Sequence, residues 1–92
     1  DWLTLSFANK TDIWFHTKDI HGSHVILKVD GNVSDDILVK CAEIAAKHSK
    51  AKDSSNVPVD YCKVQYVKKP NGAKPGMVIF TNNKTLNVKP LK

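Results

Sequence analysis

The fold is decided by the stretch DIWFHTKDIHGSHVILKVDGNVSDDILVKCAEIAAKHSK, residues 12–50. Its first part contains two runs, residues 12–18 and 24–29, that are rich in aromatic and β-branched residues and therefore predict strands. Between them lie residues 19–23, which include the Asp, Gly and Ser typical of turns. Two strands joined by such a short link predict a β-hairpin.

The second part of this stretch predicts one long helix. Ser34 is a favourable N-cap, and the two aspartates that follow it suit the positive end of a helix dipole. The last turn, up to Lys50, is basic, which suits the negative end. The positions expected to be buried recur at helical spacing and form one face: Ile37, Leu38, Cys41, Ile44, Ala45 and His48.

The pattern returns to strands after the helix. The expected segments are strands at 60–68, 77–80 and 85–88, loops at 52–58 and 69–76, and a link at 82–84. Residues 1–9 fit a short N-terminal helix and equally a strand. The chain is therefore expected to be a single domain over residues 1–92, of the α+β class, with a mainly antiparallel sheet and one long helix after the hairpin.

The charge of the chain points to a polyanion. Its 92 residues carry a net charge of +5, and all 14 cationic residues are lysines. The charge is uneven: residues 1–46 have a net charge of −3, whereas residues 47–92 have a net charge of +8. Lysine binds phosphate as a point charge, so any nucleic acid would be contacted through its backbone more than its bases. A lysine-rich, solvated surface with no polyanion partner would have the same composition.

Alternation along the two hairpin strands predicts one face that could bind nucleic acid. If the strands pair in register, this face contains Trp14, His16, Lys18, His24 and Lys28. An aromatic ring beside imidazoles and ammonium groups suits base stacking and phosphate contact. The alternative is that Trp14 fills the core and His16 forms internal hydrogen bonds.

A second candidate is the loop KKPNGAKPG, residues 68–76. The lysines Lys68, Lys69 and Lys74 would supply charge, and glycines such as Gly72 and Gly76 would let a polyanion approach the backbone. The loop fits no Walker pattern, and a solvated turn between strands would look similar. Other residues are expected to shape turns: Asp12, Asp19, Gly22 and Ser23.

Nothing in the sequence indicates an enzyme, a metal or a cofactor. Cys41 and Cys62 form neither a disulfide framework nor a CxxC pair, so two buried thiols in a reducing compartment are expected. The histidines at 16, 21 and 24 lack a common zinc-ligand spacing. No apolar run approaches the roughly 18 residues of a membrane span, and the first residues show no signal-peptide pattern.

Three separated motifs resemble one known family. They are DIWFHTKDIHGSHVIL at 12–27, CAEIAAKHSKAK at 41–52 and VPVDYCKVQYVKKPNGAKPGMVIF at 57–80, followed by the matching TLNVKP at 85–90. Together they resemble the NFACT-R domain of the NFACT proteins, in the same order and over nearly the whole chain. The chain departs from the family pattern in two places. His21 stands in the hairpin turn where the family usually has Pro, and the hairpin and the Gly-, Arg- and Asn-rich stretch that normally come first in the domain are missing. We therefore expect this chain to be a fragment of a longer protein.

The resemblance implies a role in ribosome-associated quality control. NFACT proteins of the RqcH type bind a large ribosomal subunit obstructed by peptidyl-tRNA and recruit tRNA for C-terminal tailing, and their NFACT-R domain is regarded as the RNA-binding module. The implied partners are tRNA, the large subunit and other domains of the same protein, in the cytoplasm. The family's hairpin motif and basic loop correspond here to the candidate residues named above. The alternative is a protein-interaction module, either a cell-surface fibronectin-binding activity or an intramolecular docking domain.

Overall fold

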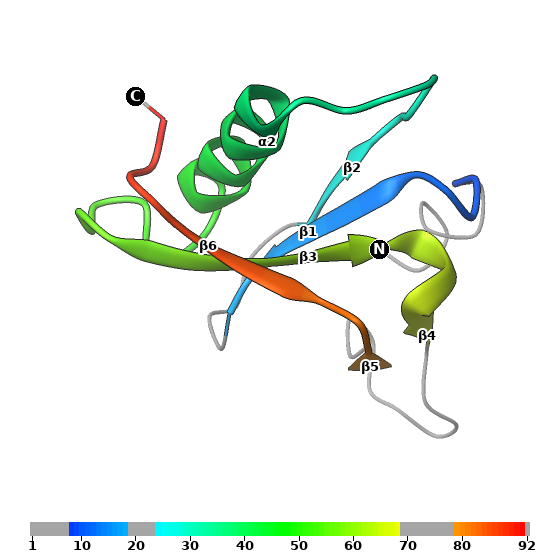
Figure 1. The fold of residues 1–92 in the computed structure, drawn as a ribbon. Coiled ribbons are helices and arrows are strands. Elements are labelled where there is room, and N and C mark those ends of the chain that lie inside the picture. Colours follow the sequence, from blue (N-terminus) through cyan, green and yellow to red (C-terminus); the bar gives the residue numbers. More distant parts are fainter. Residues whose placement is uncertain (1–7, 19–23, 69–78, 92) are drawn as a thin grey trace.

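The computed structural model describes residues 8–18, 24–68 and 79–91. Its elements follow in the order β1 (Ile13–Thr17), β2 (Val25–Leu27), α2 (Asp35–Lys47), β3 (Val57–Lys63), the 3-10 helix η1 (Val64–Tyr66), β4 (Val67–Lys68), β5 (Ile79–Phe80) and β6 (Lys84–Val88). The α+β class expected from the sequence is confirmed, with one described α-helix and antiparallel strands (Figure 1).

Four of the strands form one antiparallel sheet in the order β2-β1-β3-β6. The predicted hairpin is present, with Trp14 opposite Ile26 and Phe15 opposite Val25. β1 also pairs along its whole length with β3, from Ile13 opposite Lys63 to Thr17 opposite Val59. β1 and β3 are therefore the central strands, while β2 and β6 are the edges.

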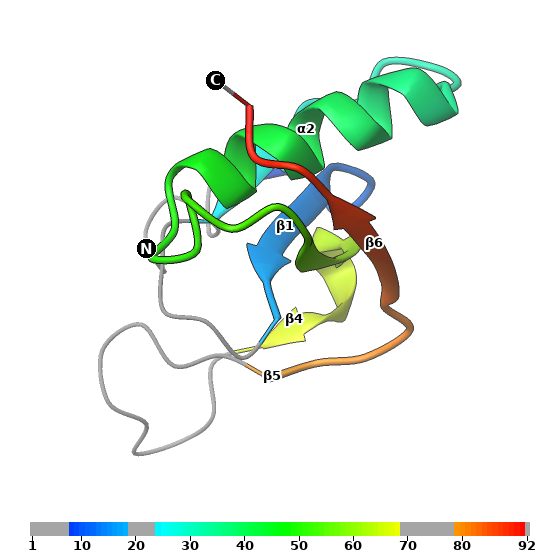
Figure 2. The same cartoon turned by 90° about the vertical axis from the view of Figure 1, so that its left-hand side faces the viewer.

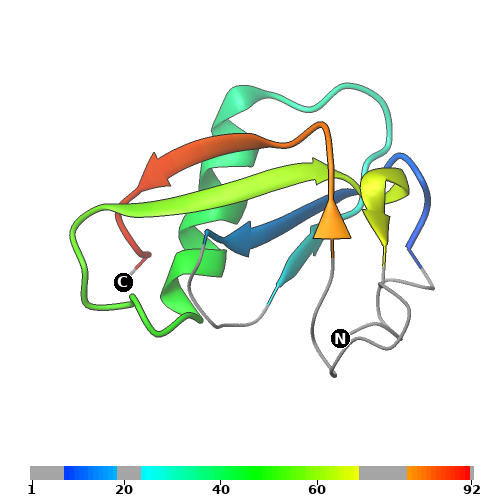
Figure 3. The same cartoon turned by 90° about the horizontal axis from the view of Figure 1, so that it is seen from below.

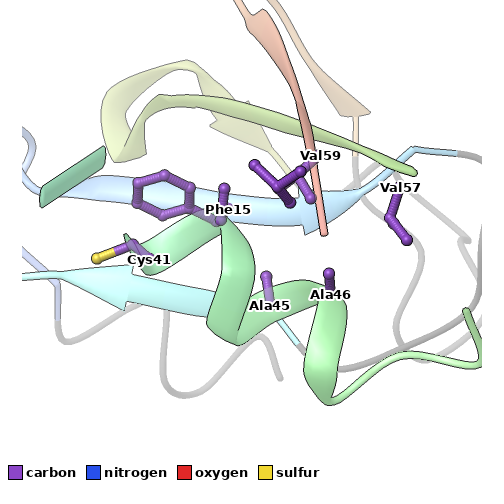
Figure 4. Close-up of a cluster of buried hydrophobic side chains, with 8 residues drawn as sticks. Phe15, Cys41, Ala45, Ala46, Val57 and Val59 are labelled. Atoms are coloured by element: carbon purple, nitrogen blue, oxygen red, sulfur yellow. The ribbon is translucent and has the colours of Figure 1, made fainter. Parts of the chain in front are cut away.

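Helix α2 lies across one face of this sheet (Figures 1 and 2). Phe15, Val57 and Val59 project from the strands toward the helix and are fully buried (Figure 4). The helix meets them with small side chains, Ala45 among them. Small residues on the helix allow it to lie close to the strands, so the layer between helix and sheet is thin and tightly packed.

The opposite face of the sheet is partly covered by a second, two-stranded sheet. β4 pairs with β5, and the two lie beneath the four-stranded sheet on the side away from α2 (Figures 2 and 3). Trp14, Cys62 and Val67 are buried between the two sheets. Partly buried apolar residues surround them: Ile26, Val64, Tyr66 and Phe80. The domain thus has two cores, one on each face of the central sheet.

The predicted helix is confirmed, but its buried face is rotated. The Ser34 hydroxyl accepts a hydrogen bond from the Ile37 backbone N–H at 3.4 Å, as expected of an N-cap. Ile37 itself is 46% exposed, and His48 is exposed because the helix ends at Lys47 and His48 is its C-cap. Ile37 and His48 lie beside the face of the helix that packs on the sheet. That face consists of Leu38, Cys41, Ala42, Ala45 and Ala46, of which Ala42 and Ala46 were not expected.

The predicted strand at 60–68 is longer at its start and broken near its end. β3 begins at Val57, inside the expected loop, because its first residues pair with β6. The chain then turns through η1, and only Val67 and Lys68 resume an extended conformation. The turn carries the chain from the central sheet to the second sheet, and Val67 can then pack under Trp14.

Other expectations fall outside the described residues. These are the proposed helix or strand over most of residues 1–9, the hairpin turn at 19–23 and the loop at 69–76. The strand predicted at 77–80 is described at Ile79–Phe80, and the strand at 85–88 begins one residue earlier, at Lys84. No helix within the described ranges is long and apolar enough to cross a membrane.

Phe15→Ala is expected to destabilise the domain by about 3–5 kcal/mol, because it leaves a cavity in the core beneath α2. Urea unfolding followed by circular dichroism measures the change. Val39→Ala on the exposed side of α2 is the matched control and should change the unfolding free energy by less than about 0.5 kcal/mol. Equal effects of the two substitutions would contradict this description of the core.

Candidate nucleic-acid interface

The hairpin face singled out from the sequence does exist as one side of the sheet. The register of β1 and β2 directs Trp14, His16 and His24 to the face away from α2. The His16 ring is stacked on the Trp14 ring, with centroids 5.5 Å apart and planes 6° from parallel. The His24 ring is tilted against the same indole at 6.5 Å. The three rings form what we call the ring cluster.

Trp14 cannot offer its ring to a nucleic-acid base in this structure. Its side chain is fully buried, and Phe80 packs against it with ring centroids 4.8 Å apart. The alternative that Trp14 belongs to the core is therefore correct, and the expectation of direct base stacking is wrong for this residue. Within the described residues its Nε1 has no hydrogen-bond partner, so packing rather than hydrogen bonding holds the indole. Trp14 acts as the support on which the two histidines rest.

The two histidines are the accessible part of the ring cluster, each being half-buried. Burial lowers the pKa of His24 below its usual value of 6.5, and the nearby His16 lowers it further by charge repulsion. His24 is therefore mainly neutral at neutral pH. A neutral imidazole can donate one hydrogen bond and accept another, which suits contact with ribose hydroxyls or phosphate oxygens.

Asp12 ties the start of β1 to the end of β2. Its carboxylate accepts hydrogen bonds from the backbone N–H groups of Val29 and Asn9, at 3.0 and 2.9 Å, and from the Lys28 ammonium at 3.0 Å. The hydrogen bonds from the Val29 and Asn9 N–H groups lower the pKa of Asp12 below its ordinary 3.8. Burial acts in the opposite direction, and the hydrogen bond and positive charge of Lys28 lower the pKa further. The residue proposed to shape turns thus closes the open end of the hairpin.

The candidate lysines differ in their availability. Lys18 is exposed at the end of β1, where its backbone N–H donates to the Pro58 carbonyl at 2.9 Å, and Lys68 is exposed in β4. Lys28 is exposed too, but its ammonium is paired with Asp12, so a phosphate would have to compete for it. The remaining candidates lie outside the described residues: Lys69, Lys74, Asp19, Gly22, Ser23, Gly72 and Gly76.

Sequence reasoning missed Asp60, which lies on the same face opposite His16. It is buried, and one of its oxygens accepts from the Thr85 hydroxyl at 2.6 Å and the Asn83 amide at 3.3 Å. This connection ties β6 to β3 and places a carboxylate beneath the face that carries the histidines. The sequence feature that could have identified Asp60 is its position as an acidic residue within the otherwise mainly apolar strand segment VPVDYC.

The cysteines are buried thiols, as expected. Burial raises the pKa of Cys41, and burial together with the Asp60 charge raises the pKa of Cys62 to about 11. Both therefore stay protonated and unreactive at neutral pH. In the described ranges no group of three or more His, Cys, Asp or Glu is placed to hold a metal ion. The described side chains of the site offer charge and hydrogen bonding.

Asp12→Asn should loosen the hairpin, because the neutral amide cannot accept three hydrogen bonds with the strength of a carboxylate. The expected result is faster hydrogen exchange at the Val29 and Asn9 amides and a lower urea midpoint. Asp30→Asn, at an exposed acid close by, removes the same charge and is the control. Unaltered exchange at both amides would show that Asp12 does not hold the hairpin.

His24 makes the stability of the domain depend on pH. Because its pKa in the folded chain lies below the 6.5 of an unfolded chain, folding stability is fully present above about pH 6.5 and is lost as the pH falls through the folded value. Thermal unfolding between pH 7.5 and 5 should show this loss, and His24→Gln should reduce it. A pH profile that His24→Gln does not flatten would refute the assignment.

The sequence of this chain matches that of a known protein family. The model of the "NFACT protein RNA binding domain", NFACT-R, matches residues 1–82. The "Rqc2 homolog RqcH" of Bacillus subtilis is 51% identical over 90 residues, and that of Streptococcus suis is 44% identical, each covering 98% of this chain. The chain spans 16% of the length of these two relatives.

A solved structure has the same fold. It is the C-terminal part of the fibronectin/fibrinogen-binding protein from Streptococcus suis, which is 43% identical and superimposes with a TM-score of 0.91. The match covers 100% of this chain and 37% of that one. The resemblance noted from the three sequence motifs is thus confirmed by sequence and by fold. The chain belongs to the NFACT-R family, the RNA-binding domain of NFACT proteins.

Proposed function

We propose that this chain is an RNA-binding module of a ribosome-associated quality-control factor, and that it helps to hold tRNA on an obstructed large ribosomal subunit. The single observation that carries the proposal is membership of a family described as RNA binding, over residues 1–82. RqcH relatives at 44–51% identity support the link to quality control. The structure adds a face whose chemistry suits RNA.

The proposed RNA face consists of the accessible edges of His16 and His24 with the surrounding lysines, Lys18 and Lys68. Both lysines are exposed, and neither forms an ion pair with another described residue. Lysine ammonium groups bind phosphate oxygens without reading base identity, so the face would hold RNA by its backbone. Lys69 and Lys74 lie outside the described residues and are further candidates from the sequence alone, because Lys69 adjoins Lys68 and Lys74 belongs to the same basic segment.

In this proposal the module binds and does not catalyse. Peptide-bond formation on a stalled chain is carried out by the ribosome, so the domain needs only to position RNA. Its partners would be tRNA, ribosomal RNA of the large subunit and other domains of the same protein, and its location would be the cytoplasm.

A second candidate function, docking to protein, is favoured by one observation. Among the residues that the structure describes, three large apolar side chains are exposed, and Ile79 in β5 is 56% accessible. The partner would be another domain of the same protein or, as the name of the Streptococcus suis relative suggests, fibronectin at the cell surface. An apolar interface would be nearly independent of salt, which separates it from binding to phosphates.

The test is fluorescence anisotropy with labelled bulk tRNA over a series of salt concentrations. For single strands, the logarithm of the affinity should fall with the logarithm of salt with a slope of about −0.7 per phosphate contact, and somewhat more steeply for duplex regions. The triple substitution K68E/K69E/K74E should reduce the affinity by at least about a hundredfold at 0.1 M salt, because each of three contacts is lost and a negative charge is added.

The matched control is K10E/K40E/K63E, which changes the net charge equally at three exposed lysines outside the proposed RNA face. Circular dichroism confirms that each variant is folded. Affinity unchanged by the first triple, or reduced equally by both, would overturn the assignment of this face. Binding that does not respond to salt would favour docking to protein.

A further inference from the structure

A second basic surface lies at the C-terminal end of α2, away from the proposed RNA face. It is a hollow of about 610 Å³ between the end of the helix, the loop that follows it and the segment after β6. Its lining is Lys47, His48, Lys52, Asp53, Ser54, Ser55, Lys89, Pro90 and Leu91. We call it the α2-end hollow.

The walls of this hollow are held in place by hydrogen bonds. The buried Ser49 hydroxyl donates to the Ala46 carbonyl at 2.7 Å and accepts from the Ala51 N–H at 3.1 Å, which fixes the path of the loop as it leaves the helix. On the other side, the Leu91 N–H donates to the Glu43 carbonyl at 3.2 Å. This bond holds the segment after β6 against α2, so the hollow does not depend on a ligand for its shape.

The charge around the hollow is positive and not neutralised by ion pairs. Lys47, Lys52 and Lys89 are all exposed, and none of them pairs with an acidic residue within the described ranges. Asp53 is the acidic residue of the lining. Because unpaired ammonium groups around a concave surface raise the local concentration of anions, such a surface attracts a polyanion.

The end of a helix does not by itself explain this cluster. Basic residues in a last turn stabilise the helix dipole, which accounts for Lys47. Lys52 comes from the following loop and Lys89 from the segment after β6, so they reach the hollow from two other parts of the chain. Three separate parts of the chain therefore contribute to the positive charge of the hollow.

We propose that the α2-end hollow is a second RNA-contacting site, which binds phosphates of the RNA backbone. Phosphodiester oxygens suit the lysines as point charges and the hydroxyl of Ser55 as a hydrogen-bond donor. At about 30 Å³ per water, the hollow has room for on the order of twenty waters, enough for a phosphate with parts of its neighbouring sugars. The inference rests on the proposed function and extends it, because the site is separate from the RNA face.

The two lysine groups lie at different ends of the sheet. In Figure 1 the loop after α2 and the segment after β6 lie at the left, whereas β4 and β5 lie at the lower right. The seven residues of β3 run between these ends, a span of roughly 23 Å at 3.3 Å per residue. One phosphate cannot contact both Lys68 and the hollow. In this proposal the domain therefore binds either several nucleotides of one RNA strand or two strands at once.

The test compares K47Q/K52Q/K89Q with the control K10Q/K40Q/K63Q, which removes the same charge at exposed lysines elsewhere. Binding of labelled bulk tRNA is followed by anisotropy against salt. Loss of two or three contacts predicts a salt slope shallower by about 1.4–2 and an affinity lower by about 30- to 100-fold at 0.1 M salt. The control should have a clearly smaller effect. In ¹⁵N spectra, tRNA should shift the amide signals of Lys52, Ser55 and Lys89.

The outcomes separate this inference from the proposed function. If wild type binds tRNA but the hollow variant matches the control, the hollow inference is overturned and the proposed function stands. If the hollow variant loses affinity while K68E/K69E/K74E does not, the hollow stands and the proposed RNA face fails. If wild type does not bind tRNA at low salt, both fail. Equal binding of polyglutamate and a single-stranded RNA of the same charge would assign the hollow to acidic peptides and overturn it as an RNA site.

Discussion

The structure depends on the burial of two consecutive aromatic residues on opposite faces of one strand. Trp14 and Phe15 are both fully buried, although neighbouring side chains of a strand point in opposite directions. A strand with both faces covered has to be central, and it needs one packing layer on each side. Helix α2 supplies one layer, and η1 with the β4–β5 sheet supplies the other. The order of the strands and the break after Lys63 both follow from this requirement.

The surface proposed to bind RNA is built on the second of these cores. His16 and His24 are placed by their contacts with the Trp14 indole, which reaches solvent nowhere itself. Asp12 accepts a hydrogen bond from the backbone just after β2, and Asp60 accepts hydrogen bonds from side chains preceding and within β6, so the two carboxylates hold together the sheet that carries the histidines. The polar side chains of this face are therefore positioned by a rigid sheet, which limits the entropy that binding has to remove.

Local signals in the sequence were sufficient for most elements, and long-range packing decided the rest. The Ser34 cap and the alternation of the hairpin strands depend on neighbours in the chain, and both are as predicted. The exposure of Ile37 depends on how α2 is rotated about its axis against the sheet, which no local pattern contains. Burial of Trp14 likewise required the β4–β5 sheet, whose residues lie more than 50 positions away in the chain. The lysines proposed to bind RNA were selected by charge alone, and composition can indicate a polyanion but not the number of sites that would bind it.

The pairing of β1 with β3 has a consequence for the order in which the chain folds during its own synthesis. The paired residues are some forty to fifty positions apart, with β2 and the whole of α2 between them. Hairpin and helix can form as soon as they leave the ribosome, but β1 has an unpaired edge until Lys63 has emerged. Trp14 lacks its covering layer for longer, until β4 and β5 have also emerged, so the nascent domain exposes an aromatic surface that can associate with other chains. Pairing of β3 with β1, followed by packing of the β4–β5 sheet over Trp14, then protects the new chain from aggregation.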